Sequence, residues 1–120
     1  MDFNKLMQVN EVIKHVEPQQ VKTLLDENNI MFIDVRSKQG YEAGHIPGAK
    51  SLDRGMLEFY ISDGSPLEIK EITRDKNRKY IIYCNKGGQS ALATKTFNDM
   101  GYANAYNLKG GYSAWSSLQD

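Results

Sequence analysis

Apolar residues come in short runs along most of the chain, and turn-forming residues separate the runs. Residues 30–35 (IMFIDV) and 80–83 (YIIY) are nearly continuous apolar runs. Runs of this length are typical of strands that are buried on both faces of a sheet. Further strands are expected at residues 12–16, around residues 50–52 and at residues 103–108.

Between these predicted strands, apolar residues fall at helical spacing. In residues 90–100, Ala93, Phe97 and Met100 share one helix face, and Gly101 ends the pattern. Other helices are expected after Glu17-Pro18, at residues 39–43 and 54–60, and after Gly110-Gly111. This alternation of strands and helices predicts an α/β domain with a largely parallel sheet, in which ligands bind at the carboxyl ends of the strands.

The first residues have weaker patterning than the rest of the chain. Residues 5–13 show only weak amphipathic spacing. Residues 1–12 are therefore predicted to form an N-terminal arm or short helix, and residues 13–120 a single domain of ordinary size. The polar residues 67–78 are predicted to be a surface connection with one helical turn.

Composition narrows the range of functions. The formal net charge is zero, so no strong attraction to nucleic acid or to an anionic membrane is expected. No apolar stretch is long enough to span a membrane, and the N-terminus lacks a secretory apolar region, so a cytoplasmic location is predicted. His15 and His45 lie far apart in a chain with a single cysteine, which predicts no metal site and no internal disulfide.

That cysteine, Cys84, follows the predicted strand at residues 80–83 and precedes Gly87-Gly88 and a predicted helix. In such a unit, loop N–H groups and the positive end of the helix dipole converge on the residue that ends the strand. A thiol in that field ionises more readily, and the thiolate is the nucleophile. The alternative is a buried cysteine that acts only as a small apolar side chain.

The loop after Cys84 argues against phosphate chemistry. A cysteine phosphatase places an arginine six positions after the cysteine, where it binds the oxyanion through two hydrogen bonds. Ser90 occupies that position here, and it is predicted to cap the N-terminus of the following helix. The loop is thus too short and too weakly charged for phosphate or arsenate.

Three segments resemble the rhodanese family and together cover roughly residues 15–118. Residues 33–36 (IDVR) with 41–49 (YEAGHIPGA) resemble its first signature, the loop at Cys84 resembles its active site, and residues 108–115 (LKGGYSAW) resemble its C-terminal signature. The resemblance implies a single-domain sulfurtransferase fold. Its central, mostly parallel five-stranded sheet would be flanked by helices on both faces.

The resemblance also implies a thiosulfate sulfurtransferase-like activity with Cys84 as the catalytic residue. The Cys84 thiolate would take sulfane sulfur from a donor such as thiosulfate or a persulfide, and would pass it from a Cys84 persulfide to a thiophilic acceptor. The expected partners are a small anionic sulfur donor, a thiol or cyanide acceptor, and a sulfur-relay protein. Nucleic acid, membrane, metal and organic cofactor are not expected to take part.

The expected substrate-binding residues follow the cysteine, with one addition from residues 54–60. They are Asn85, Lys86, Gly87, Gly88, Gln89, Ser90 and Arg54. The backbone N–H groups of the loop are expected to hold the anionic persulfide, and the two glycines to let the backbone curl closely. Arg54 is expected to add positive charge at the border of the pocket, with a solvated surface arginine as the equal alternative.

Gln89 departs from the family pattern, which commonly has arginine at this position. A neutral hydrogen bond is about half as strong as a charge-assisted one, so anion capture is expected to be weaker unless Lys86 compensates. Lysine at this position also occurs in rhodaneses that use thiosulfate, so the resemblance favours a thiosulfate-like or persulfide donor over a mercaptopyruvate-like one. The alternative role of Lys86 is that of a solvated loop lysine. Gln89 in place of arginine favours an alternative function, that of a rhodanese-like binding or regulatory module with little turnover. A third hypothesis is a persulfide carrier that serves a protein partner and has little thiosulfate turnover.

Three residues of the first signature are expected to be structural. Asp34 and Arg36 are predicted to make hydrogen bonds to neighbouring loops at the end of their strand. His45 is predicted to organise the turn that follows, without acting as a general base.

Overall fold

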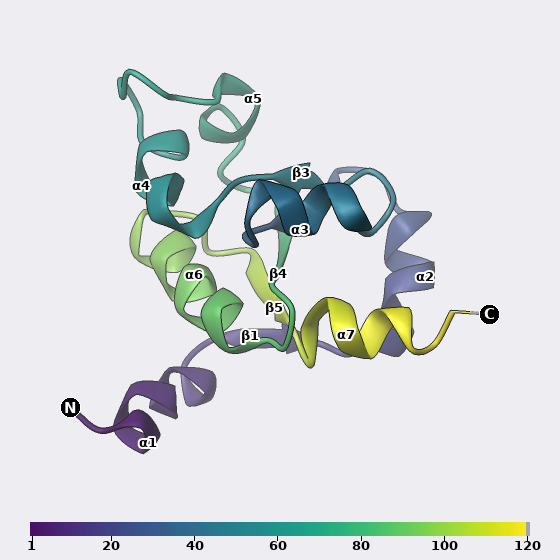
Figure 1. Cartoon of the computed structure of the whole chain (residues 1–120). Helices are drawn as coiled ribbons and strands as arrows, with labels where there is room; N and C mark the ends of the chain where they lie inside the picture. Colours follow the sequence, from purple (N-terminus) through teal and green to yellow (C-terminus); the bar gives the residue numbers. More distant parts are fainter. Residues whose placement is uncertain (120) are drawn as a thin grey trace.

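The computed structural model describes residues 1–119, which form a five-stranded parallel sheet with strand order β1-β5-β4-β2-β3 (Figure 1). The strands are β1 (Lys14–Val16), β2 (Ile30–Asp34), β3 (Lys50–Ser51), β4 (Lys79–Tyr83) and β5 (Ala105–Leu108). Each expected strand is present, and β4 is the central one. The predicted α/β class and five-stranded parallel sheet are confirmed.

Alternate residues of the central strands enter two separate apolar layers. On one face, Ile33 and Ile82 pack with Phe97, whereas on the other face Phe32 and Ile81 pack beneath a different set of helices. The first layer is covered by α4 (Leu57–Tyr60), α5 (Lys70–Thr73) and α6 (Gly88–Asp99), and the second by α2 (Val21–Leu25), α3 (Lys38–Ala43) and α7 (Gly111–Ser116). Figure 1 shows α4 and α6 on one side of the strands and α2 and α7 on the other. Burial on both faces explains why these strands are continuously apolar.

The start of α6 corrects one sequence-based prediction. The helix begins at Gly88, two residues before the expected start, and Gly87 is its N-cap with a φ of 99°. The prediction that Ser90 caps the helix is therefore wrong, because Ser90 lies inside the first turn. Its side chain is turned toward the strands instead of back along the helix.

The N-terminal segment contains two short helices, α1 (Phe3–Leu6) and the 3₁₀ helix η1 (Met7–Glu11). In Figure 1, α1 projects from the body of the molecule, while η1 contacts α6. The His15 ring bonds the Asn10 carbonyl oxygen at 2.9 Å and so ties this segment to β1. The division of the chain at residue 12 stays a prediction.

Two further 3₁₀ helices connect the remaining elements. The 3₁₀ helix η2 (Pro18–Gln20) precedes α2, and η3 (Arg54–Met56) precedes α4. Glu17 and Gln20 form a capping box at the start of η2, which explains why the chain turns into a helix directly after β1. Within residues 1–119, no helix is long and apolar enough to cross a lipid bilayer.

Candidate active site

Cys84 directly follows β4, so the central strand of the sheet delivers its side chain to the carboxyl edge. The chain then turns through Gly87 into α6. Gly87 adopts a left-handed φ of 99°, and a Cβ atom there would lie 3.1 Å from the backbone nitrogen of Gly110. Glycine is thus required at position 87, whereas a Cβ at Gly88 would meet open space. Of the two glycines expected to allow the curl, the structure gives this role to Gly87.

The Cys84 sulfur accepts hydrogen bonds from two backbone N–H groups of the loop. Sγ lies 3.1 Å from the nitrogen of Gly87 and 3.4 Å from that of Ser90. The residue is 5% exposed, and it stands at the N-terminal end of a helix of 12 residues. Two aimed N–H groups and the positive end of a helix dipole stabilise negative charge on sulfur.

Ser90 links the sulfur to the neighbouring strand. It is fully buried, its Oγ lies 3.3 Å from Cys84 Sγ, and its hydroxyl donates to Asn107 Oδ1 at 2.6 Å. Asn107 lies on β5 and is 2% exposed. The sequence patterns did not indicate Asn107 as a site residue, although an amide within a buried strand is a signal for a polar contact.

The start of α7 holds the loop from the opposite side. The nitrogen of Tyr112 donates to the carbonyl oxygen of Cys84 at 2.8 Å, and that of Ser113 donates to Asn85 at 3.0 Å. Gly111 has a φ of 63°, and a Cβ atom there would lie 2.6 Å from the Cys84 oxygen. The second glycine of the Gly110-Gly111 pair therefore lets the last helix pack directly against the active-site loop.

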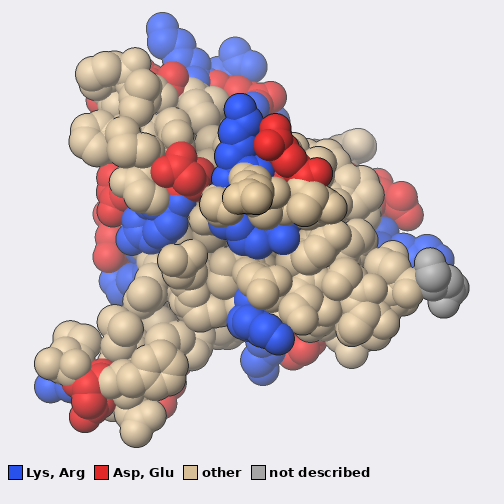
Figure 2. Space-filling view, viewed as in Figure 1, with Lys and Arg blue, Asp and Glu red and all other residues tan. Residues whose placement is uncertain are grey.

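A cavity of about 600 Å³ opens above the sulfur. Its lining residues are Arg36, Ser37, Gly40, Cys84, Asn85, Lys86, Gly88 and Gln89. The structure thus brings together Cys84 and most of the predicted loop residues, and it adds Arg36 and Ser37 from the connection between β2 and α3 and Gly40 from α3. Figure 2 shows Lys and Arg side chains along the middle of the face on which α3, α6 and α7 meet.

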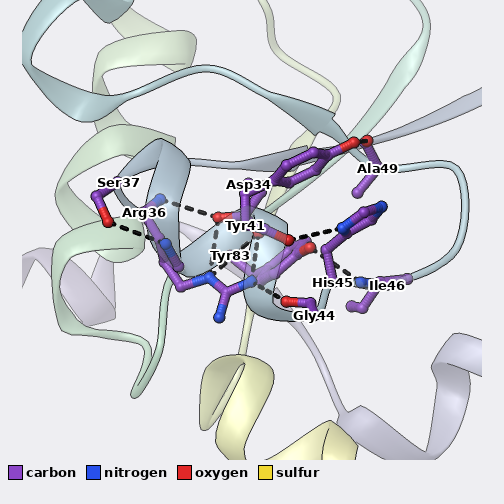
Figure 3. A network of polar contacts seen from close by, with 10 residues as sticks. Asp34, Arg36, Ser37, Tyr41, Gly44, His45, Ile46, Ala49 and Tyr83 are labelled. Atoms are coloured by element: carbon purple, nitrogen blue, oxygen red, sulfur yellow. Dashed lines mark hydrogen bonds and ion pairs between the residues drawn. The ribbon is translucent and has the colours of Figure 1, made fainter.

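Arg36 is held in place at this cavity by a buried carboxylate (Figure 3). Its Nη2 donates to Asp34 Oδ2 at 2.7 Å and to the carbonyl oxygen of Gly44 at 2.6 Å, and its Nε contacts both carboxylate oxygens. The guanidinium carbon lies 4.3 Å from the centre of the Tyr112 ring. The hydrogen bonds to Asp34 raise the pKa of Arg36 above its ordinary value. The predicted structural role of the pair is confirmed, and it also fixes a cation at the cavity wall.

His45 organises the neighbouring turn, as predicted. Its Nδ1 bonds the carbonyl oxygen of Tyr41 at 2.8 Å, and the two rings stack with centroids 3.7 Å apart (Figure 3). The next nitrogen, that of Ile46, lies 3.1 Å from the hydroxyl of Tyr83. These contacts fasten the turn to β4 and leave the imidazole outside the residues that line the Cys84 cavity.

Arg54 does not join the site. Its guanidinium bonds Glu58 at 3.1 Å and Thr96 at 3.2 Å, and the cavity beside Cys84 is lined without it. Thr96 lies in the later half of α6, away from the helix end that faces the sulfur. The 3₁₀ turn at residues 54–56 directs the side chain along α6, which the sequence alone did not indicate.

Comparison with known proteins gives one family. The model of the rhodanese-like domain matches residues 17–118. The chain is 27% identical over 104 residues to the thiosulfate sulfurtransferase GlpE of Pseudoalteromonas translucida, with 87% of this chain and 90% of that protein covered.

Solved structures agree with this match. A Rhodopseudomonas palustris protein of unknown function, described as a possible tyrosine phosphatase, superposes with a TM-score of 0.83 at 33% identity, covering 93% of this chain and 86% of that one. The human single-domain sulfurtransferase superposes with a TM-score of 0.76 at 23% identity, covering 88% and 97% of the two chains. At that identity the human protein supports the fold alone.

Proposed function

This chain belongs to the rhodanese-like domain family, and from that premise we propose that it transfers sulfane sulfur from an anionic donor to a thiophilic acceptor through a persulfide on Cys84. One observation carries the proposal. The Cys84 sulfur faces a cavity of about 600 Å³ while two backbone N–H groups donate to it. This arrangement suits a nucleophile that alternates between a thiolate and a slightly longer anion.

In the first half-reaction, the Cys84 thiolate attacks the outer sulfur of thiosulfate. A sulfur–sulfur bond to Cys84 forms, the bond to the sulfite sulfur breaks, and sulfite leaves with the electron pair. The product is a Cys84 persulfide whose terminal sulfur carries the negative charge. The N–H groups of Gly87 and Ser90 stay on the inner sulfur, and the outer sulfur extends into the cavity.

In the second half-reaction, a nucleophile such as cyanide or a thiolate attacks the outer sulfur. The bond to Cys84 breaks, and Cys84 leaves as the thiolate that the loop stabilises. Cyanide gives thiocyanate and a thiolate gives a new persulfide. Because the first product leaves before the acceptor reacts, the kinetics are expected to be ping-pong.

Two cationic side chains line the cavity that a dianionic sulfur donor would enter. Lys86 of the loop and Arg36, which lies two residues after β2, both line the cavity. Gln89 adds an amide donor without charge. Thiosulfate or a small persulfide fits these groups, because the positive charge attracts the anion before the sulfur atoms meet.

Phosphatase chemistry, which the description of one relative suggests, fits the site less well. The position six residues after the cysteine holds Ser90, whose hydroxyl donates to buried Asn107. Ser90 has no guanidinium with which to bind a phosphate through two hydrogen bonds. Arg36 has its own carboxylate partner in Asp34. Sulfur transfer therefore explains the site better than phosphate hydrolysis does.

The proposal is tested by thiocyanate formation from thiosulfate and cyanide, with Cys84→Ser as the control. Mass spectrometry after incubation with thiosulfate is expected to show one added sulfur, on Cys84. Equal thiocyanate formation by the serine variant would refute the mechanism. Cys84-dependent hydrolysis of p-nitrophenyl phosphate without any sulfur transfer would support the phosphatase instead.

The second candidate is a binding or regulatory module, which neutral Gln89 favours, and the third is a protein-partnered persulfide carrier. Each predicts a different pattern in the same experiments. A carrier takes up sulfur from a protein or glutathione persulfide but reacts slowly with thiosulfate. A binding module takes up sulfur from none of these donors.

A further inference from the structure

A continuous chain of hydrogen bonds runs from the active-site sulfur to the imidazole of His15. Cys84 Sγ lies 3.3 Å from Ser90 Oγ, which lies 2.6 Å from Asn107 Oδ1. Asn107 Nδ2 lies 3.3 Å from His15 Nδ1, and His15 Nε2 lies 2.9 Å from the carbonyl oxygen of Asn10. Ser90 and Asn107 are buried, so the middle of the chain is shielded from water.

The contact between His15 and Asn10 decides which group donates and which accepts in each of these hydrogen bonds. The Asn10 carbonyl oxygen only accepts, so Nε2 of a neutral His15 carries the proton and Nδ1 is an acceptor. Nδ1 then requires the amide nitrogen of Asn107, and this orientation turns Oδ1 toward Ser90. Ser90 has one hydroxyl proton, and it donates that proton to Asn107.

These donor and acceptor roles determine what the Cys84 sulfur faces. Because the Ser90 hydroxyl donates its proton to Asn107, a lone pair of the Ser90 oxygen faces Cys84. A lone pair accepts from a thiol S–H but repels a thiolate. The backbone N–H groups of Gly87 and Ser90 act in the opposite sense, because they donate to the sulfur and favour the anion.

We propose that His15 is a positioning residue that controls, through Asn107 and Ser90, whether a hydroxyl proton or a lone pair faces the Cys84 sulfur. The proposal rests on the proposed role of Cys84 as the nucleophile. When Nδ1 of His15 gains a proton, or when the imidazole is removed, the Asn107 amide is free to rotate. Its nitrogen then donates to Ser90, and Ser90 donates to the thiolate.

Asn107 couples the two ends of this hydrogen-bond network. An orientation that turns its amide nitrogen toward Ser90 suits both a proton on His15 Nδ1 and a thiolate at Cys84, so each of these two states favours the other. Charged groups near the imidazole affect this coupling. Glu11 of η1, Lys86 of the active-site loop and Lys109 after β5 line the same cavity, of about 570 Å³, as His15.

The test compares His15→Leu with the unchanged protein at neutral pH. A hydrogen bond to a charged group shifts an equilibrium about tenfold, so the variant is expected to hold roughly tenfold more thiolate, seen as thiolate absorbance over a Cys84→Ser blank. Alkylation by iodoacetamide is expected to rise only about threefold, because a less basic thiolate is also a weaker nucleophile. His45→Gln, which removes the other imidazole of the chain, is the matched control and is expected to leave both quantities unchanged.

A double-mutant cycle separates this role from a merely structural one. In a Ser90→Ala background the backbone N–H donors remain but the hydroxyl is absent, so His15→Leu is expected to have no effect on the thiolate. An equal effect with and without the Ser90 hydroxyl would overturn the proposal. So would an unchanged or smaller thiolate fraction in the single variant. Neither readout uses a sulfur donor, so this inference and the proposed sulfur transfer can fail separately.

Nitrogen-15 NMR of the unsubstituted protein gives a test that needs no variant. At neutral pH, His15 is expected as the Nε2–H tautomer because Nε2 faces a carbonyl oxygen. His45 is expected as the Nδ1–H tautomer because its Nδ1 faces the carbonyl oxygen of Tyr41. The two histidines serve as references for each other, and an Nδ1–H tautomer at His15 would overturn the proposal.

Discussion

At the scale of single residues, few charged side chains line the cavity beside the buried Cys84 sulfur. Lys86 lines the cavity from the loop, Gln89 from the first turn of α6, and Arg36 from the segment that follows β2. Arg36 is already paired with Asp34, whereas Lys86 appears in none of the ion pairs found within residues 1–119. Lys86 is therefore the cation with most freedom to meet a donor anion.

Replacement of Lys86 by glutamine is expected to raise the KM for thiosulfate about fivefold, because one charge-assisted contact becomes neutral. The effect should shrink at high ionic strength, where the charge is screened. Steady-state thiocyanate assays at two salt concentrations measure it. Arg54→Gln is the matched control, because Arg54 bonds Glu58 and Thr96 instead of lining the cavity, and it should change KM less than twofold. Equal effects of the two substitutions would show that overall charge matters rather than this contact.

Introduction of arginine at Gln89 is expected to act in the opposite direction. A guanidinium at the cavity wall adds a charge-assisted donor, so the KM for thiosulfate should fall about fivefold. Gln89→Met, which removes the amide and adds no charge, is the control and should not lower KM. An unchanged or raised KM in the arginine variant would mean that Gln89 does not limit anion capture.

At the scale of elements, two glycine turns converge on one loop. Gly87 leads from β4 into α6, and Gly111 leads from β5 into α7. The N-terminus of α6 donates to the sulfur, while the N-terminus of α7 donates to the carbonyl oxygens of Cys84 and Asn85. The loop is thus held on both sides by backbone groups, so its shape depends on close backbone approach more than on side chains.

Gly111→Ala is expected to disturb this packing strongly. The new Cβ would lie 2.6 Å from the Cys84 oxygen at a φ of 63°, so strain and overlap together should cost roughly 3 kcal/mol of unfolding free energy and most of the activity. Urea denaturation and the thiocyanate assay measure the two effects. Gly48→Ala is the matched control, because Gly48 has a φ of 79° with nothing within 4 Å of its added Cβ. It should cost about 1 kcal/mol and spare activity. Comparable losses in both variants would argue against a specific contact at the loop.

At the scale of the whole molecule, buried tyrosines in both layers of the core make the unfolding free energy depend on pH. Tyr80, Tyr83 and Tyr102 are fully buried, the first and last in one layer and Tyr83 in the other. Burial raises the pKa of Tyr80 to about 12, and it raises the pKa values of Tyr83 and Tyr102 as well. In the folded protein all three therefore keep their phenolic protons at a pH at which the tyrosines of the unfolded chain begin to lose theirs.

Unfolding free energy is accordingly expected to fall as pH rises above about 10, because alkali deprotonates the unfolded chain first. Each buried tyrosine contributes a slope of roughly 1.4 kcal/mol per pH unit until its own folded pKa is reached, and the stabilisation is fully present below the unfolded value. Urea denaturation between about pH 9 and about pH 11 measures the slope. Tyr102→Phe removes one of these groups and should make it shallower. A stability that stays flat over this range would contradict the expectation.

Much of this molecule follows from local pattern. The apolar runs at residues 30–35 and 80–83 predict strands buried on both faces, and the alternation with helices predicts the parallel sheet. Position also marks Cys84, because a cysteine between a strand and a glycine turn stands at a carboxyl edge. These features depend on neighbours in sequence, which is why the chain alone determines them.

Other features depend on distances between remote segments. Arg54 and Arg36 both carry a guanidinium near a strand end, yet only Arg36 lines the cavity, because Asp34 holds it there. Ser90 occupies a plausible capping position, yet its hydroxyl bonds Asn107 across 17 residues of chain. The contact of His15 with Asn107 spans 92 residues. Sequence by itself determined the sheet, the active-site loop and its thiol, since these arise from local periodicity and turn chemistry. Only the tertiary structure decided which side chains surround the sulfur, because hydrogen-bond partners are chosen by proximity in space.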